Sequence, residues 1–304
     1  MIYNILKMEN QLISVVFVTH NRKELLHQAI TAIKQQSVPV EVIVMDDAST
    51  DNTAEMICTD FPEVIYARSP VSQGPSYQRN EGAKKATSDI IIFLDDDTVA
   101  VDKHMIRDTL RDFEQPTIGS IDIPFINVLQ NNQVQNGAPD ANAVYLLHSF
   151  IGAAFAVKRD LFLSLGGFRP EYFYMGEEGD FCIRLLEAGY YIKAGTAVPA
   201  HHYQPPNRVS YRADFYGRRN DIFFLYLNSP RQYLLLTIAS TIFKGLIWGI
   251  KQGRLKNMGE GIFAGLTAMF KGDYKNLKKP VTNSIFLKFH YLKKREPLPF
   301  SQLT

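Results

Sequence analysis

Residues 90–99, IIIFLDDDTV, place three aspartates directly after a run of five apolar residues. An apolar run of this length, bounded by polar residues, is typical of a strand that is buried on both faces. Asp95, Asp96 and Asp97 follow at the end of that strand, and crowding of like charges raises the cost of keeping all three ionised. The stretch therefore predicts a strand end that meets a metal ion or a basic side chain, or else lies in solvent at a helix N-terminus.

The residues before this strand alternate between strand and helix patterns. Apolar, β-branched runs at 14–18, 41–45 and 64–67 predict three further strands. Apolar residues recur at helical spacing in the segments between them, and Asn21 with Glu24 resembles a capping box at the start of the first helix. Strands that alternate with helices predict an α/β fold with a mostly parallel sheet and right-handed crossovers.

In such a sheet, ligands bind in the crevice beyond the carboxyl ends of the strands. Asp46 and Asp47 follow the strand at 41–45, and Asn21 follows the strand at 14–18. These polar residues share an edge with the three aspartates of residues 95–97. The sequence therefore predicts that the acidic residues line a ligand crevice.

The next hundred residues continue the pattern less regularly. Residues 122–147 are polar and long for a loop in a compact domain, so we expect them to cover a site. A helix is predicted from Glu177 to about Ala188, with Gly189 as its C-terminal stop signal. A further strand ends in His201 and His202, and from about residue 211 the chain is predicted to be helical with a basic tail.

Composition excludes several classes of protein. The chain has 304 residues, of which 46% are hydrophobic and 21% charged, and its formal net charge is +2. This is ordinary for a soluble globular protein and excludes a nucleic-acid polycation. Two distant cysteines cannot build a disulfide framework and favour a reducing compartment. Residues 1–11 lack the apolar run of a signal peptide, so we expect a cytoplasmic protein.

The segment 233–250, YLLLTIASTIFKGLIWGI, raises the question of a membrane. A spanning helix needs about 20 apolar residues. This run is slightly shorter, and Lys244 inside it costs about 2.5–3.5 kcal/mol at mid-bilayer, so the sequence disfavours a span. Threonines and lysines form a narrow polar stripe, which favours an amphipathic helix packed on the protein and leaves open a helix in a membrane interface. We hypothesise that residues 233–270 rest peripherally on the inner face of the membrane.

Several short sequence motifs follow one another along the chain. They are SVVFVTHNR, IVMDDASTDNT, the pair Arg79-Asn80 before IIIFLDDD, GGF followed by GEEGDFCIRL, a strand ending in histidine, and a late RRN. Together, over residues 12–225, they resemble the family 2 glycosyltransferases of GT-A fold. The resemblance implies a Rossmann-like, mostly parallel sheet flanked by helices, with a helical C-terminal extension. We expect a nucleotide-sugar-binding half (1–120), an acceptor-binding half (121–215) and a helical C-terminal region (216–304).

Asp95-Asp96-Asp97 matches the DXD motif of that family. The resemblance implies that Asp97 and Asp95 bind a divalent metal, Mn²⁺ or Mg²⁺, and that Asp95 or Asp96 meets the ribose. The metal would neutralise the charge that develops on a departing nucleotide diphosphate. The late histidine of the family would join the metal, and we assign it to His201 while His202 stays open. The alternative is an N-cap cluster before a helix at 102–113.

Other positions match the donor site of the family. Asp47 resembles the acid that hydrogen-bonds the nucleobase, and a carboxylate accepts equally from uracil, thymine or guanine. Thr19 and Asn21 match the strand end that meets the nucleoside, although Asn21 could equally be a helix cap. Arg79 would contact the base or the phosphates, and Arg219 would clamp the diphosphate; for each, the alternative is a solvated arginine on a helix surface.

Glu178 matches the acidic position of the ED motif, where an inverting transferase keeps its general base. One positioned carboxylate that removes the acceptor proton contributes about 10²–10⁴-fold. The neighbouring carboxylates of Glu177 and Asp180 compete for the assignment. All three could also interact with the positive end of a helix dipole.

The resemblance therefore implies a metal-dependent, inverting glycosyltransferase of polysaccharide biosynthesis. Its partners would be a nucleotide-diphosphate sugar and a saccharide or lipid-linked saccharide acceptor, with no nucleic acid. A nucleotidyltransferase is one alternative, but it should carry a glycine-rich loop after the first strand, and THNRKELL has no glycine. The other alternative is a binding module that has lost turnover.

Overall fold

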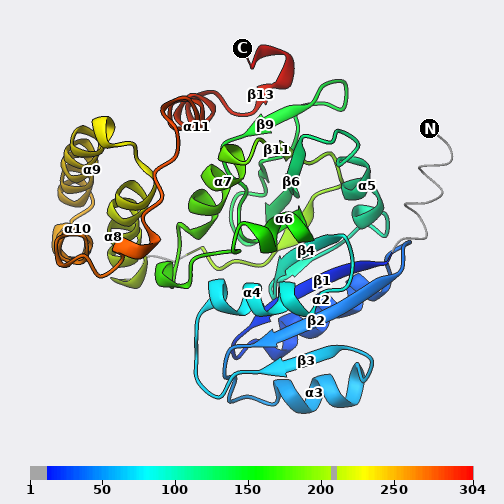
Figure 1. Cartoon of the computed structure of the whole chain (residues 1–304). Helices are drawn as coiled ribbons and strands as arrows, with labels where there is room; N and C mark the ends of the chain where they lie inside the picture. Colours follow the sequence, from blue (N-terminus) through cyan, green and yellow to red (C-terminus); the bar gives the residue numbers. More distant parts are fainter. Residues whose placement is uncertain (1–11, 207–210, 304) are drawn as a thin grey trace.

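The computed structural model describes residues 12–206 and 211–303. Most of them form one mixed α/β unit around a nine-stranded sheet of order β13-β9-β11-β6-β10-β4-β1-β2-β3 (Figure 1). Strands β10 and β9 are antiparallel to their neighbours, and the other seven strands point the same way. The prediction of an α/β fold with a mostly parallel sheet is confirmed. The first eleven residues, in which we saw no signal peptide, lie outside the described residues.

The elements of the first part of the chain follow the predicted alternation of strand and helix. They are β1 (Ile13–Thr19), α2 (Lys23–Lys34), β2 (Val40–Asp46), α3 (Thr53–Asp60), β3 (Ile65–Arg68), α4 (Pro75–Lys85), β4 (Ile90–Asp95), β5 (Thr98–Val99) and α5 (Met105–Arg111). Strands β3, β2, β1 and β4 pair in parallel, so their carboxyl ends meet at one edge. Glycine at position 82 lets α4 lie against β1, because a Cβ there would collide with the side chain of Val16.

Two details at the strand ends differ from the sequence prediction. Helix α2 begins at Lys23 and is preceded by Arg22, so Asn21 is no helix cap, and its φ of +55° puts it in the left-handed region. The three aspartates of residues 95–97 do not cap the next helix either. Strand β5 follows them, and His104 is the residue that precedes α5.

The middle of the chain adds strands to the large sheet and forms a second, smaller sheet with β5. It contributes β6 (Ile118–Asp122), β7 (Phe125–Asn127), β8 (Val134–Gln135), β9 (Tyr145–Leu147), β10 (Ala154–Lys158), α6 (Arg159–Ser164), η1 (Pro170–Tyr172), α7 (Glu177–Glu187), β11 (Tyr191–Ala194) and β12 (Ala200–His202). The segment 122–147, predicted as a loop, contains three short strands. Two of them join β5 and β12 in a four-stranded sheet of order β5-β12-β7-β8. This small sheet carries the late histidines to the end of β4.

A cluster of phenylalanines joins α6 and α7 to the large sheet. The Phe150 and Phe155 rings stack with centroids 4.0 Å apart, and Phe93 stacks on Phe155 at 4.8 Å. Phe168 and Phe181 pack edge-on or tilted around them. All five side chains are buried. Because this cluster lies between β10 and α7, it fixes the start of α7 beside the end of β4.

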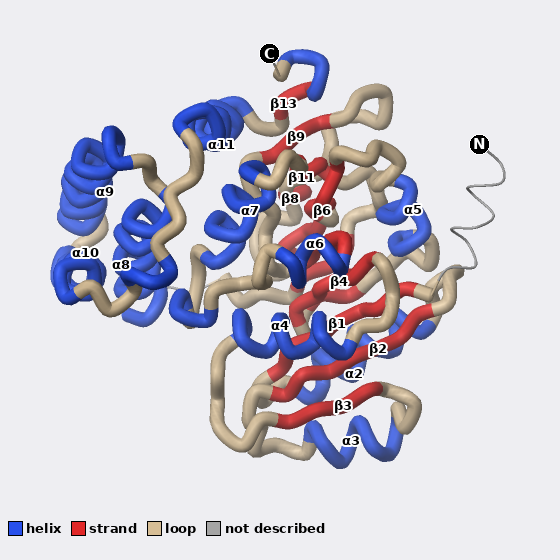
Figure 2. The backbone as a smooth tube through the Cα atoms, in the orientation of Figure 1, coloured by secondary structure: helices blue, strands red, loops and turns tan. Residues whose placement is uncertain are grey.

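The C-terminal region is helical, as predicted (Figure 2). It contributes α8 (Tyr211–Asn228), α9 (Arg231–Lys251), α10 (Leu255–Lys271), η2 (Lys275–Leu277), α11 (Asn283–Arg295), β13 (Leu298–Pro299) and η3 (Phe300–Gln302). Glycines bring α9 and α10 close to α8: a Cβ at Gly245 would lie 3.2 Å from Arg218, and one at Gly265 2.9 Å from Ile222. The sequence did not predict β13, which pairs with β9 at the edge of the large sheet.

Helix α9 contains residues 233–250, the apolar segment for which the sequence left a role at a membrane interface open. Among the described residues it is the one helix long and apolar enough to cross a membrane, judged by length and composition alone, and only 17% of its apolar window is buried. With 21 residues it is not short for a span, contrary to our expectation from the sequence. Ile238, Gly245 and Gly249 are its buried residues, and most of the rest faces outward.

Candidate active site

A cleft of about 800 Å³ lies at the carboxyl ends of β1 and β4 and extends to the start of α7. Its lining includes Thr19, Asp47, Arg79, Asp95, Asp96, Glu177, Glu178 and His202. The sequence prediction that the acidic strand ends share one crevice is therefore confirmed in space.

Each of the three adjacent aspartates has a cationic neighbour. Asp95 accepts a hydrogen bond from Arg79 at 2.8 Å. Asp96 and Asp97 both accept from Nη1 of Arg22, at 3.0 and 2.7 Å. Repulsion among the three adjacent carboxylates is therefore offset in part, because two arginines lie among them. The sequence analysis missed Arg22, although its place directly after THN at a strand end was the available signal.

Asp96 is buried although it lines the cleft. Burial raises the pKa of Asp96 to about 7; the Arg22 guanidinium opposes the rise, and the Asp97 carboxylate adds to it. Thr19 donates from Oγ1 to the same carboxylate at 2.8 Å. Thr19 therefore holds Asp96 in place, in addition to lining the cleft.

His202 and Asp97 are arranged as ligands of a cation. Nδ1 of His202 lies 2.7 Å from Oδ1 of Asn127, an acceptor, so Nδ1 carries the proton and Nε2 the lone pair of the neutral ring. That Nε2 lies 3.1 Å from Oδ1 of Asp97, and both side chains are buried. Two lone pairs this close are stabilised by a proton or a metal ion beside them. Histidines that ligate metals usually have the other ring nitrogen held in this way.

Asp95 completes this group. One ligand atom each from Asp95, Asp97 and His202 lies within 4.8 Å of the others. Carboxylate and imidazole ligands suit Mn²⁺. They also suit Mg²⁺, which has a weaker preference for nitrogen ligands. Our sequence assignment to His201 is replaced by His202, because side chains alternate along β12 and His201 points to the other face.

Arg79 is not a solvated arginine on a helix surface. Its guanidinium is buried and bonds to Asp95, to Glu177 at 3.1 Å and to the carbonyl of Gly152 at 3.0 Å. Burial alone would lower the pKa of Arg79, but the charges of Asp95 and Glu177 outweigh it and the pKa is raised. Arg79 therefore ties the end of β4 to the start of α7.

The three acidic side chains at the start of α7 have separate surroundings. Asp180 is fully buried and paired with Arg169 at 2.6 Å and Arg184 at 2.9 Å. Burial raises the pKa of Glu177 to about 8, with Glu178 adding to the rise and Arg79 opposing it. Glu178 lines the cleft and lies beside Gly152, where a Cβ would come within 2.7 Å of its Oε1. Of the three, Glu178 is the one open to a substrate hydroxyl.

Asp47 lies in the cleft with its carboxylate fully engaged. It accepts hydrogen bonds from Ser72, Gln73, Gly74 and Gln78 at 2.6 to 3.1 Å. Burial opposes ionisation, but these four donors outweigh it and lower the pKa of Asp47. A carboxylate has about four acceptor sites. Its assignment to the nucleobase stays a prediction, and a base could bond to it only by displacing one of these donors.

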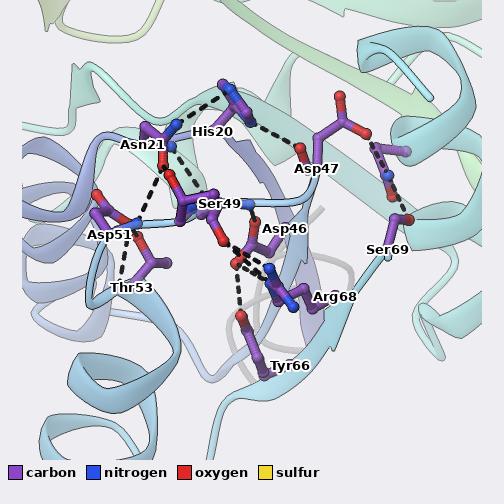
Figure 3. Close-up of polar contacts among 12 residues, drawn as sticks. His20, Asn21, Asp46, Asp47, Ser49, Asp51, Thr53, Tyr66, Arg68 and Ser69 are labelled. Atoms are coloured by element: carbon purple, nitrogen blue, oxygen red, sulfur yellow. Dashed lines mark hydrogen bonds and ion pairs between the residues drawn. The ribbon is translucent and has the colours of Figure 1, made fainter. Parts of the chain in front are cut away.

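Asn21 and Arg219 do not line the cleft. Figure 3 shows Asn21 directed at the turn after β2, where its Oδ1 accepts from the amides of Thr50 at 2.7 Å and Asp51 at 3.2 Å. In the same turn, Asp46 accepts from Tyr66 at 2.6 Å and from the amide of Ser49 (Figure 3). Asn21 thus stabilises a turn beside the cleft.

Arg219, which the sequence predicted to clamp a diphosphate, is not among the residues that line the cleft. Arg219 donates to the carbonyl of Glu171 at 2.9 Å and to Tyr274 at 3.2 Å, so it anchors α8. Arg212 lines the cleft instead, with its guanidinium over the Tyr174 ring at 4.5 Å. Sequence reasoning missed Arg212 because it belongs to none of the quoted motifs.

Comparison with known proteins shows the family of this chain. The model of the family described as "Glycosyl transferase family 2" matches residues 14–166, which is half of the chain. This chain belongs to glycosyl transferase family 2. The match contains the predicted DXD motif, Asp47 and Arg79, and it ends before Glu178.

Individual relatives within family 2 are distant. The chain is 29% identical to an uncharacterized glycosyltransferase of Haemophilus influenzae over 58% of this chain and 62% of that protein. A second H. influenzae glycosyltransferase is 39% identical over 32% of this chain and 40% of its own length. The O-antigen chain rhamnosyltransferase RfbN of Salmonella typhimurium is 25% identical over 64% and 68%. The chain thus spans less than two thirds of the first two relatives.

Solved structures confirm the GT-A fold. The mannosyltransferase PcManGT of Pyrobaculum calidifontis, solved with GDP-Man and Mn²⁺, superposes with a TM-score of 0.59 at 16% identity, over 94% of this chain and 84% of that one. S. aureus TarS 1-349 with UDP-GlcNAc gives 0.60 at 16% identity, over 93% and 87%. At this identity the likeness establishes the fold and leaves the substrate open.

Proposed function

We propose that this protein transfers a glycosyl group from a nucleotide-diphosphate sugar to a hydroxyl of a saccharide or lipid-linked saccharide. The observation that carries the proposal is the Asp95, Asp97 and His202 group at the edge of a cleft that also contains Glu178. Family membership supports the reaction class, and the O-antigen relatives support polysaccharide biosynthesis as its setting.

The donor would lie with its diphosphate at the end of β4. Asp95, Asp97 and His202 would hold a divalent metal, which when bound supplies positive charge to the diphosphate. Arg22 and Arg79 keep the aspartates in place by ion pairs, so little reorganisation is needed when the donor arrives. Arg212, which also lines the cleft beside Tyr174, would meet a phosphate or the base.

Glu178 would act as the general base. Its carboxylate accepts the proton of the acceptor hydroxyl as that oxygen forms a bond to the anomeric carbon. The bond from the anomeric carbon to the diphosphate oxygen breaks, and the electron pair leaves with the nucleotide. Attack from the side opposite the leaving group inverts the anomeric centre. Glu177 is unsuited to this role because it is buried against Arg79.

A screen with nucleotide sugars tests the reaction class. Purified protein would be incubated with UDP-, GDP-, dTDP- and CMP-sugars, with and without Mn²⁺, and the released nucleotide measured. We expect Mn²⁺-dependent release from one donor, even by slow transfer to water. Calorimetry on the same panel covers a strict requirement for an acceptor. Folded protein that binds none of the donors would contradict the proposal.

We also propose that α9 and α10 rest on an anionic membrane surface on the cytoplasmic side. The six most exposed large apolar side chains of the described residues, between 65% and 80% exposed, all lie on these two helices: Leu235, Leu236, Phe243, Ile250, Phe263 and Phe270. Helix α9 carries one arginine and two lysines and has no acidic residue. An apolar face with basic residues is typical of a helix in a bilayer interface.

Vesicle flotation tests this location. We expect binding to vesicles that contain phosphatidylserine, weaker binding to phosphatidylcholine alone, and release from cell membranes by alkaline carbonate. No flotation with anionic vesicles would contradict the proposal, and resistance to carbonate would favour a spanning α9 instead.

A further inference from the structure

A second cavity, of about 230 Å³, adjoins the cleft between α7, α8 and α11. Met175 and Gly176 line both spaces. Gly179, the residue after Glu178, lines the second one. Drug-sized ligands occupy pockets of about 300–1,000 Å³, so this cavity suits a smaller group, of the size of a single ring. The two spaces therefore adjoin close to Glu178.

Two glycines inside helices keep this cavity open. Gly179 of α7 and Gly217 of α8 line it, and a Cβ built on either would meet no atom within 4 Å. Glycine weakens a helix interior relative to alanine, which applies to Gly217 within α8, whereas Gly179 lies in the first turn of α7. Packing explains Gly245 and Gly265, whose Cβ atoms would touch α8, but it does not explain these two. The cavity therefore has open space beside both glycines.

The walls combine aromatic and paired polar groups. The Phe224 and Phe289 rings lie 5.5 Å apart, and His148 meets Phe289 edge-on at 5.2 Å. Arg218 and Asp221 form an ion pair of 2.9 Å whose side chains stay 30% and 43% exposed. A sugar ring has C–H groups for an aromatic wall and neighbouring hydroxyls that both donate to a carboxylate and accept from a guanidinium.

We propose that this cavity binds one sugar ring of the acceptor, adjoining the hydroxyl that Glu178 deprotonates. The inference rests on the proposed function, because it takes the acceptor to enter beside Glu178. It adds that the acceptor is at least a disaccharide or a glycoside with a second ring, since a lone monosaccharide at Glu178 would leave the cavity unfilled.

Methyl NMR on the full chain tests the cavity directly. The protein would carry ¹³C-methyl methionine, and the Met175 signal would be assigned with Met175→Leu. A panel of methyl glycosides of hexoses, 6-deoxyhexoses and N-acetylhexosamines would be titrated, with inorganic phosphate in a separate arm. We expect a saturable shift of the Met175 signal with at least one glycoside.

Two variants separate this cavity from the rest of the cleft. Gly217→Leu fills the cavity and should weaken glycoside binding at least tenfold, while nucleotide affinity stays unchanged. Gly259→Leu is the matched control, because Gly259 of α10 also has open space at its Cβ and lies outside the cavity lining. It should behave as the wild type.

Three results would overturn the inference: no glycoside shifts the Met175 signal of folded protein, the shift survives Gly217→Leu, or only phosphate produces it. Nucleotide binding, measured on the same samples, distinguishes these results from failure of the proposed function. Glycoside binding without any nucleotide binding would keep the sugar cavity and contradict the transferase.

Discussion

The two walls of the cleft hold their charged side chains in different ways. On the β4 side, Asp95, Asp96 and Asp97 each bond to a buried or half-buried arginine or histidine. On the α7 side, Glu178 is open, and the adjoining cavity is lined by glycines, aromatic rings and an exposed ion pair. Charged side chains held in fixed positions suit a partner whose charge is fixed, such as a diphosphate with its metal. Open space bordered by aromatic rings and a solvent-accessible ion pair suits an organic group such as a sugar ring of an acceptor.

Removal of the open carboxylate should have the largest effect. Glu178→Gln keeps the size of the side chain but cannot accept the acceptor proton, so transfer should fall about 10²–10⁴-fold. Donor affinity should stay near that of the wild type, because Glu178 has no part in the metal group. Initial rates and donor calorimetry on the same sample measure both. A variant that loses donor affinity to the same extent as rate would place Glu178 on the donor wall.

The second prediction separates two arginines of α8. Arg212→Ala should weaken nucleoside-diphosphate binding by about 10- to 150-fold, since a charge-assisted hydrogen bond contributes about 1.5–3 kcal/mol. Arg219→Ala should leave that affinity unchanged and lower the melting temperature, because Arg219 only holds α8 against Glu171 and Tyr274. The opposite pattern in calorimetry would restore the clamp that the sequence suggested.

The membrane face gives the third prediction. Leu236→Glu combined with Phe243→Glu puts two charges on the apolar side of α9, and both side chains are exposed, so the fold should persist. Binding to phosphatidylserine vesicles should fall several-fold. Val101→Glu, exposed outside α9 and α10, is the control. Unchanged flotation of the double variant would show that this face of α9 does not bind the membrane.

The smallest effect concerns pH. The pKa of Glu177 is about 8 in the folded chain against a usual 4.5, so the native state binds more protons than the unfolded state between these values. The free energy of unfolding should therefore fall as pH rises through that interval. Glu177→Gln should flatten the dependence, and Glu114→Gln at the surface should not. Chemical denaturation at several pH values measures the slope, and an equal slope in Glu177→Gln would contradict the burial argument.

The sequence was sufficient for much of the first half of the molecule. Apolar runs and turn residues predicted β1, β2, β3 and β4. The pattern is strongest for β1, β2 and β4, which are buried on both faces, whereas β3 is a partly exposed edge strand. The same reasoning placed the three aspartates and Asp47 at one sheet edge, since parallel strands end together. The local sequence pattern was therefore sufficient to locate the cleft.

Side-chain direction was less predictable. His201 and His202 are neighbours on a short strand, and only the pairing of β12 decides which one faces Asp97. Arg212 and Arg219 lie on the same side of α8, but two turns apart, or about 10 Å along the axis. One reaches the cleft and the other meets Tyr274. Such choices depend on contacts between distant segments, as does the pairing of β13 with β9.

The central claim is that Asp95, Asp97 and His202 form a metal-dependent donor site. The direct test is calorimetric titration of UDP, GDP and dTDP, with and without Mn²⁺, into folded wild type, Asp97→Asn, His202→Ala and His201→Ala. We expect Mn²⁺-dependent binding that falls at least about tenfold in Asp97→Asn and His202→Ala and persists in His201→Ala. Binding that ignores Mn²⁺ in the wild type, or that is lost in His201→Ala alone, would contradict it.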